Sequence, residues 1–214
     1  MKNVRTIALI ASAIAACSAF AEPLKTEYPK PMFVGTPVPI ALKNMEKPHE
    51  NKAWEYDLPA GCSNLAKGKP VTGSDSSPLL GELTYITDGD KSAEEGSYVE
   101  MAGGKQWIQV DLGKTSEIYA VLAWHYHLQA RAYKGVVVQI SDDKDFAKDV
   151  TTLYNNDVDN TVGQGAGKDF AYVENNFGKL YDAKGAKARY VRFWSNGNTS
   201  NGMNHYIEVE VWGK

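Results

Sequence analysis

The sequence predicts an all-β fold, either a β-sandwich or a closed barrel. Several short segments are rich in β-branched and aromatic residues, and some of them alternate strictly between apolar and polar positions. Clusters of Gly, Asn, Asp and Ser separate these segments at short intervals. No stretch sustains the 3.6-residue apolar stripe of an amphipathic helix. Many short strands joined by frequent turns are typical of sandwiches and barrels.

The expected strands begin after Gly61. Residues 106–113 (QWIQVDLG) alternate apolar and polar side chains, so one face of this strand should be buried. Residues 118–127 (IYAVLAWHYH) are apolar on both faces, as in a strand that is covered on both sides. The other expected strands lie in GVVVQIS, ARYVRFWS and YIEVEVWG, and turn-rich clusters such as SDDKD and SNGNTSNG separate them.

The first residues have the features of a secretory signal peptide. Lys2 and Arg5 form a positive n-region, residues 6–16 are apolar, and residues 19–21 (AFA) form a cleavage site. The apolar run is shorter than the roughly 20 residues that span a bilayer, so no transmembrane segment is expected. We therefore expect residues 1–21 to be a leader and the protein to be exported to the periplasm or the extracellular space.

A second interpretation of the leader stays open. Residues 14–17 (IAAC) resemble a bacterial lipoprotein box, in which Cys17 would be lipidated and would anchor the protein to the outer membrane. Cys62 is the only other cysteine, so the mature chain has no disulfide framework. We expect Cys62 to be a small buried apolar residue.

Proline content divides the mature chain into two parts. Residues 22–60 hold seven of the nine prolines, which excludes a helix there and predicts an extended tether. Residues 61–214 form the expected single β-sandwich domain. The formal net charge of −3 gives no basic footprint for nucleic acid. Loss of Lys2 and Arg5 with the leader makes the charge of the mature chain about −5, which argues against binding to anionic lipids.

Several sequence segments resemble a known family. Residues 64–72 (NLAKGKPVT) open the domain, and YITDGDKS, QWIQVDLGKTSEIYAV, YKGVVVQISDDKDF, ARYVRFWSNG and YIEVEVWG follow in order. Together they resemble the coagulation factor 5/8 type C family, also called discoidin domains, which overlaps the galactose-binding-like carbohydrate modules of bacteria. The resemblance covers roughly residues 61–213. It implies an antiparallel jelly-roll β-sandwich of about eight strands.

The chain departs from this family at two places. Many animal members join the ends of the domain by a disulfide, but Cys62 has no cysteine partner near the C-terminus. This departure favours the bacterial, disulfide-free branch. Residues 155–179 are long and polar where the family usually has a short connection, and this insertion has no counterpart in the resemblance.

One loop carries the oxygen-rich pattern of a calcium site. Asp88 and Asp90 flank Gly89, and a dense set of oxygen ligands suits Ca²⁺, although an ordinary Asp-Gly turn has the same sequence. The resemblance implies one structural calcium ion in this loop, completed by a glutamate on the last strand, here Glu208. The remaining ligands would be Ser92 and the main-chain carbonyls of Tyr85 and Ile207. Residues 155–160 (NNDVDN) are expected to form a solvated loop, with a second calcium site as the alternative.

The segment WHYHLQARAY (124–133) is the candidate ligand loop. His125 and His127 share a face if the strand continues through them, and such a pair binds zinc when a third ligand, here His205, joins it. The resemblance implies instead that the loop after this strand grips a sugar with histidine, arginine and asparagine side chains. Arginine offers five fixed donors to sugar hydroxyls, and an aromatic side chain covers the apolar face of the ring. The candidate ligand-binding residues are His125, His127, Arg131, Tyr133, Trp194, Asn196 and Asn198.

Structural roles are the alternative for the same loop. Trp124 and Tyr126 fit a core, His125 fits a strand histidine with its hydrogen bonds satisfied, and Arg131 fits an ion pair with an acidic loop. No nucleophile motif such as G-x-S-x-G occurs, and GQGAGK (163–168) lacks the spacing of a phosphate-binding loop. We therefore expect a non-catalytic, lectin-like protein that binds a polysaccharide or cell-surface glycan through loops at one end of the sandwich. The alternative is a protein-interaction or adhesion module of an extracellular complex.

Overall fold

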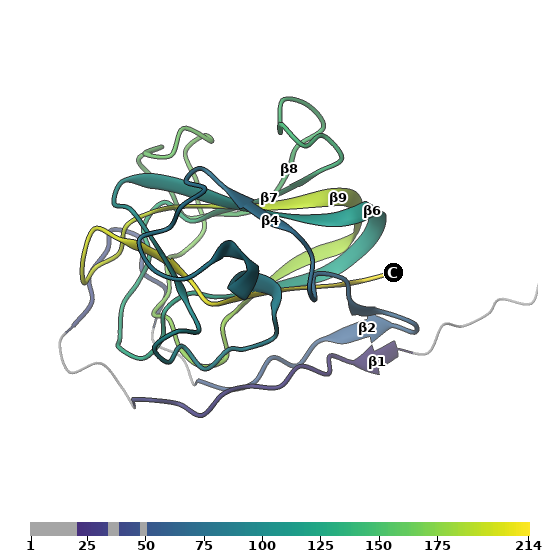
Figure 1. Cartoon of the computed structure of the whole chain (residues 1–214), viewed down its shortest axis with the longest axis horizontal. Coiled ribbons are helices and arrows are strands. Elements are labelled where there is room, and N and C mark those ends of the chain that lie inside the picture. The colour runs from purple at the N-terminus through teal and green to yellow at the C-terminus, as the bar shows by residue number, and fades with distance from the viewer. Residues whose placement is uncertain (1–20, 34–38, 48–50) are drawn as a thin grey trace, which may run out of the picture.

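The computed structural model of the chain describes residues 21–33, 39–47 and 51–214 (Figure 1). Except for Ala21, the expected leader lies outside the described residues, and so does Cys17. Within the described ranges, no helix has the length and hydropathy needed to cross a membrane. The described elements are β1 (Ala21–Pro23), β2 (Asp57–Pro59), β3 (Ser63–Asn64), β4 (Val71–Gly73), the 3₁₀ helix η1 (Leu83–Thr87), β5 (Val99–Met101), β6 (Lys105–Trp124), β7 (Val137–Ser141), β8 (Thr151–Asn155), β9 (Lys179–Asn196), β10 (Asn204–Tyr206) and β11 (Glu208–Gly213).

The strands form an antiparallel β-sandwich. The main sheet has seven strands in the order β3-β11-β6-β9-β7-β8, with β4 paired to β6, and every named pair in it is antiparallel. A second, two-stranded sheet joins β5 to β10. The fold is therefore the antiparallel jelly-roll sandwich that the resemblance implies, and the closed-barrel alternative is wrong.

Two long strands, β6 and β9, build both layers of the sandwich. They pair with each other along most of their length, and the register shifts between Asp111 and Ser116 and again between Ile118 and Ala120. Such bulges bend a strand, and Figure 1 shows β6 and β9 curving together. The sequence predicted two separate strands here. The glycine at 113 has a φ of +87° and marks an irregularity within one strand, not the reversal of a hairpin.

The inner face of the sandwich holds the main core. Ile108 and Val110 are fully buried and Leu112 is 3% exposed, as the alternating pattern predicts. Gln109 and Asp111 lie on the opposite face, where they accept hydrogen bonds from Arg192 and Arg189 on β9. Burial of each large apolar side chain contributes roughly 1.5–3 kcal/mol, so this face provides most of the fold's stability.

The second half of β6 is apolar on both faces because a second layer covers its outer side. Ala120, Leu122 and Trp124 are fully buried in a separate cluster, and residues from the proline-rich segment pack against it. Polar contacts fix this packing: the Tyr56 hydroxyl donates to the carboxylate of Asp182 over 2.7 Å. The covering side chains from the proline-rich segment are Leu24, Tyr28, Trp54 and Tyr56.

The proline-rich segment leaves β1 and returns to β2, which pair with each other. Between them, residues 39–47, named the strap here, lie against the insertion 155–179. The amide of Glu46 donates to the carbonyl of Ala171 over 2.8 Å, and the amide of Ala171 donates to the carbonyl of Asn44 over 2.9 Å. The described parts of segment 22–60 therefore lie along the domain, and the insertion provides one surface that binds them.

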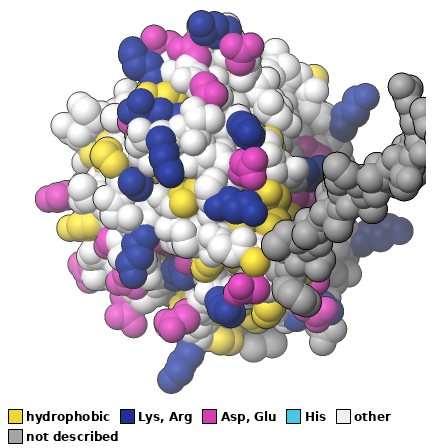
Figure 2. Space-filling view, turned by 90° about the vertical axis from the view of Figure 1, so that its right-hand side faces the viewer, with side chains coloured by type: hydrophobic (Ala, Val, Ile, Leu, Met, Phe, Trp, Pro, Cys, Tyr) yellow, Lys and Arg dark blue, Asp and Glu magenta, His cyan; other side chains and the backbone are white. Residues whose placement is uncertain are grey.

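The end of the domain that carries β1, β2 and the C-terminus has a mixed surface. Figure 2 shows this side of the molecule, with basic and acidic side chains interspersed among small apolar areas. The strap lies at the opposite end (Figure 1). That opposite end, where the loops after β6, β8 and β9 meet, is named the loop end here.

Candidate functional site

The predicted calcium loop follows η1 and is held by its own turns. The carboxylate of Asp88 accepts the amide of Asp90 over 2.7 Å, and the carboxylate of Asp90 accepts the amide of Ser92 over 2.9 Å. Both aspartates are exposed. From β11, one carboxylate oxygen of Glu208 accepts the amide of Gly89 over 3.0 Å. The fold thus brings the loop and Glu208 together, as the resemblance implies.

The surroundings of Glu208 fit a hard cation. Its side chain is fully buried, and its other oxygen, Oε1, has no hydrogen-bond partner among the described residues. Burial raises the pKa of this carboxyl group to about 9. No group of three or more His, Cys, Asp or Glu side chains is placed to hold a metal ion in the described part of the chain. A cation here would therefore be held by Glu208 together with loop oxygens, including those of Ser92, Tyr85 and Ile207, and oxygen donors of this kind suit Ca²⁺.

The two histidines of the candidate ligand loop have different partners, because β6 ends at Trp124. His125 is fully buried, and its Nδ1 donates to Glu174 over 2.8 Å while its ring stacks on Tyr133 with centroids 4.4 Å apart. The Nε2 of His127 donates to the carbonyl of Lys91 over 2.9 Å. The expectation that both histidines share one strand face is therefore wrong. Burial lowers the pKa of His127, so its ring is neutral at pH 7.

Arg131 and Tyr133 are also inside the domain. The guanidinium group of Arg131 lies 4.4 Å from the ring centroid of Tyr126 and donates to the Gln129 side chain over 3.1 Å. Arg131 is 4% exposed, and no carboxylate forms an ion pair with it among the described residues. The Tyr133 hydroxyl donates to Nδ1 of His205 over 2.8 Å. Both side chains are therefore packed inside the domain under the surface of the loop end.

The remaining candidates separate into three positions. Trp194 is 9% exposed on the outer face of β9, where its indole donates to Gln139 over 3.1 Å. Asn198 is 3% exposed, and its side chain bonds within its own loop, to Asn201 and to the carbonyl of Met203. Asn196 is half-buried and lines a cavity. The structure therefore brings Tyr133 and Asn196 to one cavity and places Trp194 on the sheet face.

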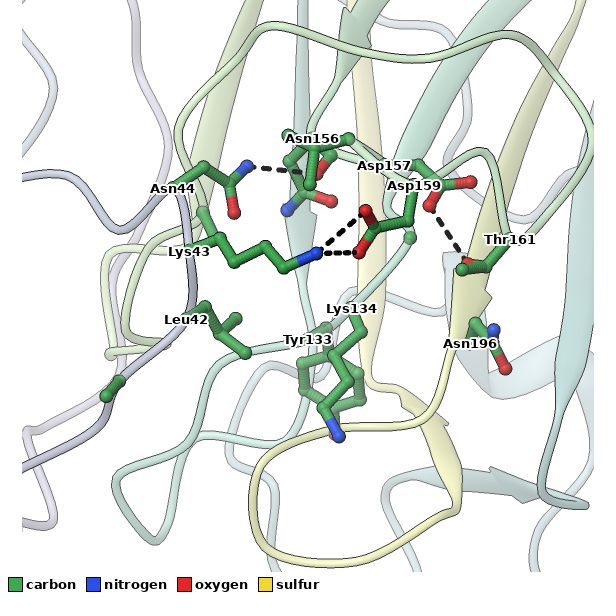
Figure 3. A pocket seen from close by; sticks show the side chains of 14 residues that line it. Leu42, Lys43, Asn44, Tyr133, Lys134, Asn156, Asp157, Asp159, Thr161 and Asn196 are labelled. Atoms are coloured by element: carbon green, nitrogen blue, oxygen red, sulfur yellow. Dashed lines mark hydrogen bonds and ion pairs between the residues drawn. The ribbon is translucent and has the colours of Figure 1, made fainter.

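This cavity lies at the loop end, between the strap and the loops that follow β6, β8 and β9, and has a volume of about 330 Å³ (Figure 3). The Lys43 ammonium group forms an ion pair with Asp159 over 2.9 Å, and the two side chains meet across the space. The side-chain amide of Asn44 donates to the carbonyl of Asn156 over 3.0 Å. A second, more open hollow adjoins it and is lined by strap residues 39–42, by Gln129 and Ala130, and by Lys134, Thr199 and Ser200.

Sequence reasoning missed the strap residues of this site. Lys43 and Asn44 lie in a segment that the proline pattern predicts as a tether, which gives no signal for a binding residue. Asp159 belongs to NNDVDN, whose composition predicts only an oxygen-rich, solvated loop. That polar run was the one available signal for the end of the molecule at which this cavity lies.

The fold defines a class of protein, the jelly-roll β-sandwich domains, and the loop end of this one carries the two hollows. The profile of one family, described as the F5/8 type C, NedA-like, galactose-binding domain, matches residues 85–193. The chain belongs to this family, which confirms the resemblance. None of the curated proteins compared with the chain matches it.

Solved structures with this fold include both isolated modules and multidomain enzymes. A fucose-binding module of Streptococcus pneumoniae has a TM-score of 0.50 at 22% identity, over 70% of this chain and 96% of the module. A truncated AlyQ with CBM32 and alginate lyase domains has a TM-score of 0.52 at 22% identity, over 72% of this chain and 34% of that one. A family 89 glycoside hydrolase from Clostridium perfringens has a TM-score of 0.50 at 19% identity, over 71% of this chain and 14% of the enzyme. The similarity thus covers a whole binding module but only a small part of each enzyme.

Proposed function

We propose that this protein is an exported, non-catalytic, lectin-like module that binds a polysaccharide or a cell-surface glycan through its loop end. Membership in the galactose-binding family supports the ligand class. Among proteins of the same fold, one is described as a fucose-binding module and another as an AlyQ fragment with a CBM32 domain. Export rests on the sequence of the leader, with lipidation of Cys17 as the alternative.

The observation that carries the proposal is the concave loop end of a chain from this family. Sugar sites combine a small number of polar groups with apolar surface in a hollow of this kind. Here the exposed side chains of Gln129 and Lys134 border the open hollow, and Tyr133 and Asn196 line the adjoining cavity. Arg131 donates to the Gln129 side chain, so we infer that it holds this border of the hollow in place, whereas His127 lines a separate hollow beside residues 31–33 and 175–177.

We also propose a structural calcium ion between Glu208 and residues 85–92. The buried and unpartnered Oε1 of Glu208 supports it, because a carboxylate at that depth needs a positive charge or a proton. The ion would hold the 3₁₀ helix and the following loop against β11. It would not contact the sugar, since the strap and the loop end are built from other residues.

Binding of the mature chain to a panel of polysaccharides and immobilised glycans, with Ca²⁺ present, tests the proposal. Lys134→Ala removes an exposed ammonium group at the loop end, and Lys187→Ala removes an exposed one from β9, where it pairs with Glu117. We expect the parent and Lys187→Ala to bind equally and Lys134→Ala to bind more weakly. A folded parent that binds no glycan would refute the proposal and favour the protein-interaction alternative, for which the adjacent exposed side chains of Leu79 and Leu80 are the first candidates.

A further inference from the structure

The strap is held firmly against the domain at the point where it borders the cavity. Two main-chain hydrogen bonds join it to Ala171, and the Asn44 side chain adds bonds to the carbonyls of Asn156 and Asp169, over 3.0 and 2.8 Å. Lys179 on β9 also forms an ion pair with Glu46 over 3.2 Å, with both side chains largely buried. Because its neighbours fix the strap, its side chains have defined positions in the cavity wall.

Several polar groups around the cavity are available to a ligand. The side-chain amide of Asn196 and the ammonium group of Lys134 have no hydrogen-bond or ion-pair partner among the described residues. Asn156 is 5% exposed, and its Nδ2 is likewise without a partner there. Asn196 and Lys134 therefore leave two donors at the cavity free for a ligand, while the Asn156 amide lies below the surface.

The cavity also has apolar surface and a suitable size. The half-buried side chains of Leu42 and Val158 provide apolar area beside the polar groups, and Tyr133 and Ala171 lie at the base of the wall with almost no exposed surface. A volume of about 330 Å³ is at the small end of the range for ligand sites, which runs from roughly 300 to 1,000 Å³. A single sugar ring presents hydroxyl groups around its edge and C–H groups on its faces, and this wall chemistry complements both.

We propose that the strap forms one wall of a sugar-binding pocket that holds one hexose-sized unit of the glycan. Lys43 and Asn44 contribute polar groups from the strap, and Lys134 and Asn196 contribute them from the domain (Figure 3). This inference rests on the proposed carbohydrate-binding function. The Lys43–Asp159 pair at the mouth is exposed, so it is weakly held and its charges are free to turn to sugar hydroxyls.

Titration of the ¹⁵N-labelled mature protein with D-galactose, L-fucose, N-acetyl-D-glucosamine and D-mannuronic acid tests the inference. We expect at least one sugar to shift the backbone amide signals of the pocket and to leave those of β1 and β2 unchanged. The same sugar is then titrated into two pocket variants and one control. The pocket signals to follow are those of Lys43, Asn44, Lys134, Gly135 and Asn196.

The affinities of the variants show whether the strap contacts the sugar or only lies near it. Lys43→Ala and Asn196→Ala each remove one ligand hydrogen bond and should weaken binding about 5- to 10-fold. Lys25→Ala is the matched control, because Lys25 also lies in the N-terminal segment and forms an exposed pair, with Glu22 over 3.1 Å. We expect its affinity to stay within about twofold of the parent.

Each result decides between the two proposals. Shifts confined to other residues, or unchanged affinity in both pocket variants, would overturn the strap inference and leave the carbohydrate-binding function standing. Tighter binding by Lys43→Ala would also overturn it, because the strap would then obstruct the site instead of contributing to it. No shift with any sugar, together with no binding on the glycan panel, would refute both.

Discussion

Replacement of Glu208 by glutamine tests the proposed structural calcium ion without disturbing the rest of the fold. Glutamine has nearly the same shape, and its side-chain carbonyl still accepts the amide of Gly89. Since burial raises the pKa of Glu208 to about 9, the carboxyl group is protonated at pH 7.5 when no cation is bound. Parent and Glu208→Gln should therefore differ by less than about 1.5 kcal/mol in chelator.

Calcium should then distinguish the two proteins. At a Ca²⁺ concentration 100 times the dissociation constant, binding stabilises the native state by about 2.7 kcal/mol. For a domain of this size each kcal/mol raises Tm by about 2–4 °C, so the parent should gain about 5–10 °C. Glu208→Gln loses the one buried carboxylate of the site, while the exposed Asp88 and Asp90 remain. Its Tm should rise by less than about 2 °C.

Differential scanning calorimetry in EDTA and in Ca²⁺, with Mg²⁺ as a second cation, measures both quantities. An equal rise of Tm in parent and variant would show that the ion binds elsewhere. A parent that gains nothing from Ca²⁺ would refute the reasoning from the unpartnered Oε1 altogether.

Three further predictions concern stability. Gly178→Ala should lower the free energy of unfolding in urea by about 2–4 kcal/mol, because φ is +62° and an added Cβ would lie 2.7 Å from the Ala123 carbonyl oxygen. Gly163→Ala, at φ +81° with open space around it, should lower it by only about 1–2 kcal/mol. Equal losses would contradict the packing argument. Burial lowers the pKa of His127, so as the pH falls the unfolded chain is protonated before the folded one, and the parent should lose stability below about pH 6.5. His127→Gln should lose less stability between about pH 7 and 5. Parallel plots of unfolding free energy against pH would contradict this account. Asn44→Ala removes two hydrogen bonds from the strap, so the amides of Glu46 and Ala171 should exchange hydrogen at least about fivefold faster. Unchanged exchange rates would mean that the main-chain hydrogen bonds are sufficient to hold the strap.

The strand pattern predicted most of the sandwich, because period-2 alternation is a local property. Ile108 and Val110 face the core as that pattern requires. The apolar run 118–124 correctly indicated a strand buried on both sides, but not what buries its outer face. That layer comes from Tyr28 and Trp54, which are far away in the sequence and lie in a segment whose prolines indicate only an extended chain.

The candidate site was predicted less well, because its geometry depends on where β6 ends. The strand stops at Trp124, so His125 and His127 do not share a face, and each finds its partner in a different loop. Residue type alone also could not show that Arg131 is buried beneath the loop end. Asn196 was predicted as a ligand-binding residue and does reach a cavity, whereas the other wall of that cavity comes from the strap.

The course of the N-terminal segment also determines how the protein is presented. Ala21 pairs with Pro59, and this pair and the C-terminus lie at one end of the domain, while the strap lies at the other (Figure 1). Anything attached before Ala21 or after Lys214, such as a lipid anchor, a surface partner or a fusion protein, would meet the domain at the end remote from the cavity. A protein attached in this way would point its loop end away from the attachment surface. The cavity would then be open to ligands that lie at a distance from that surface.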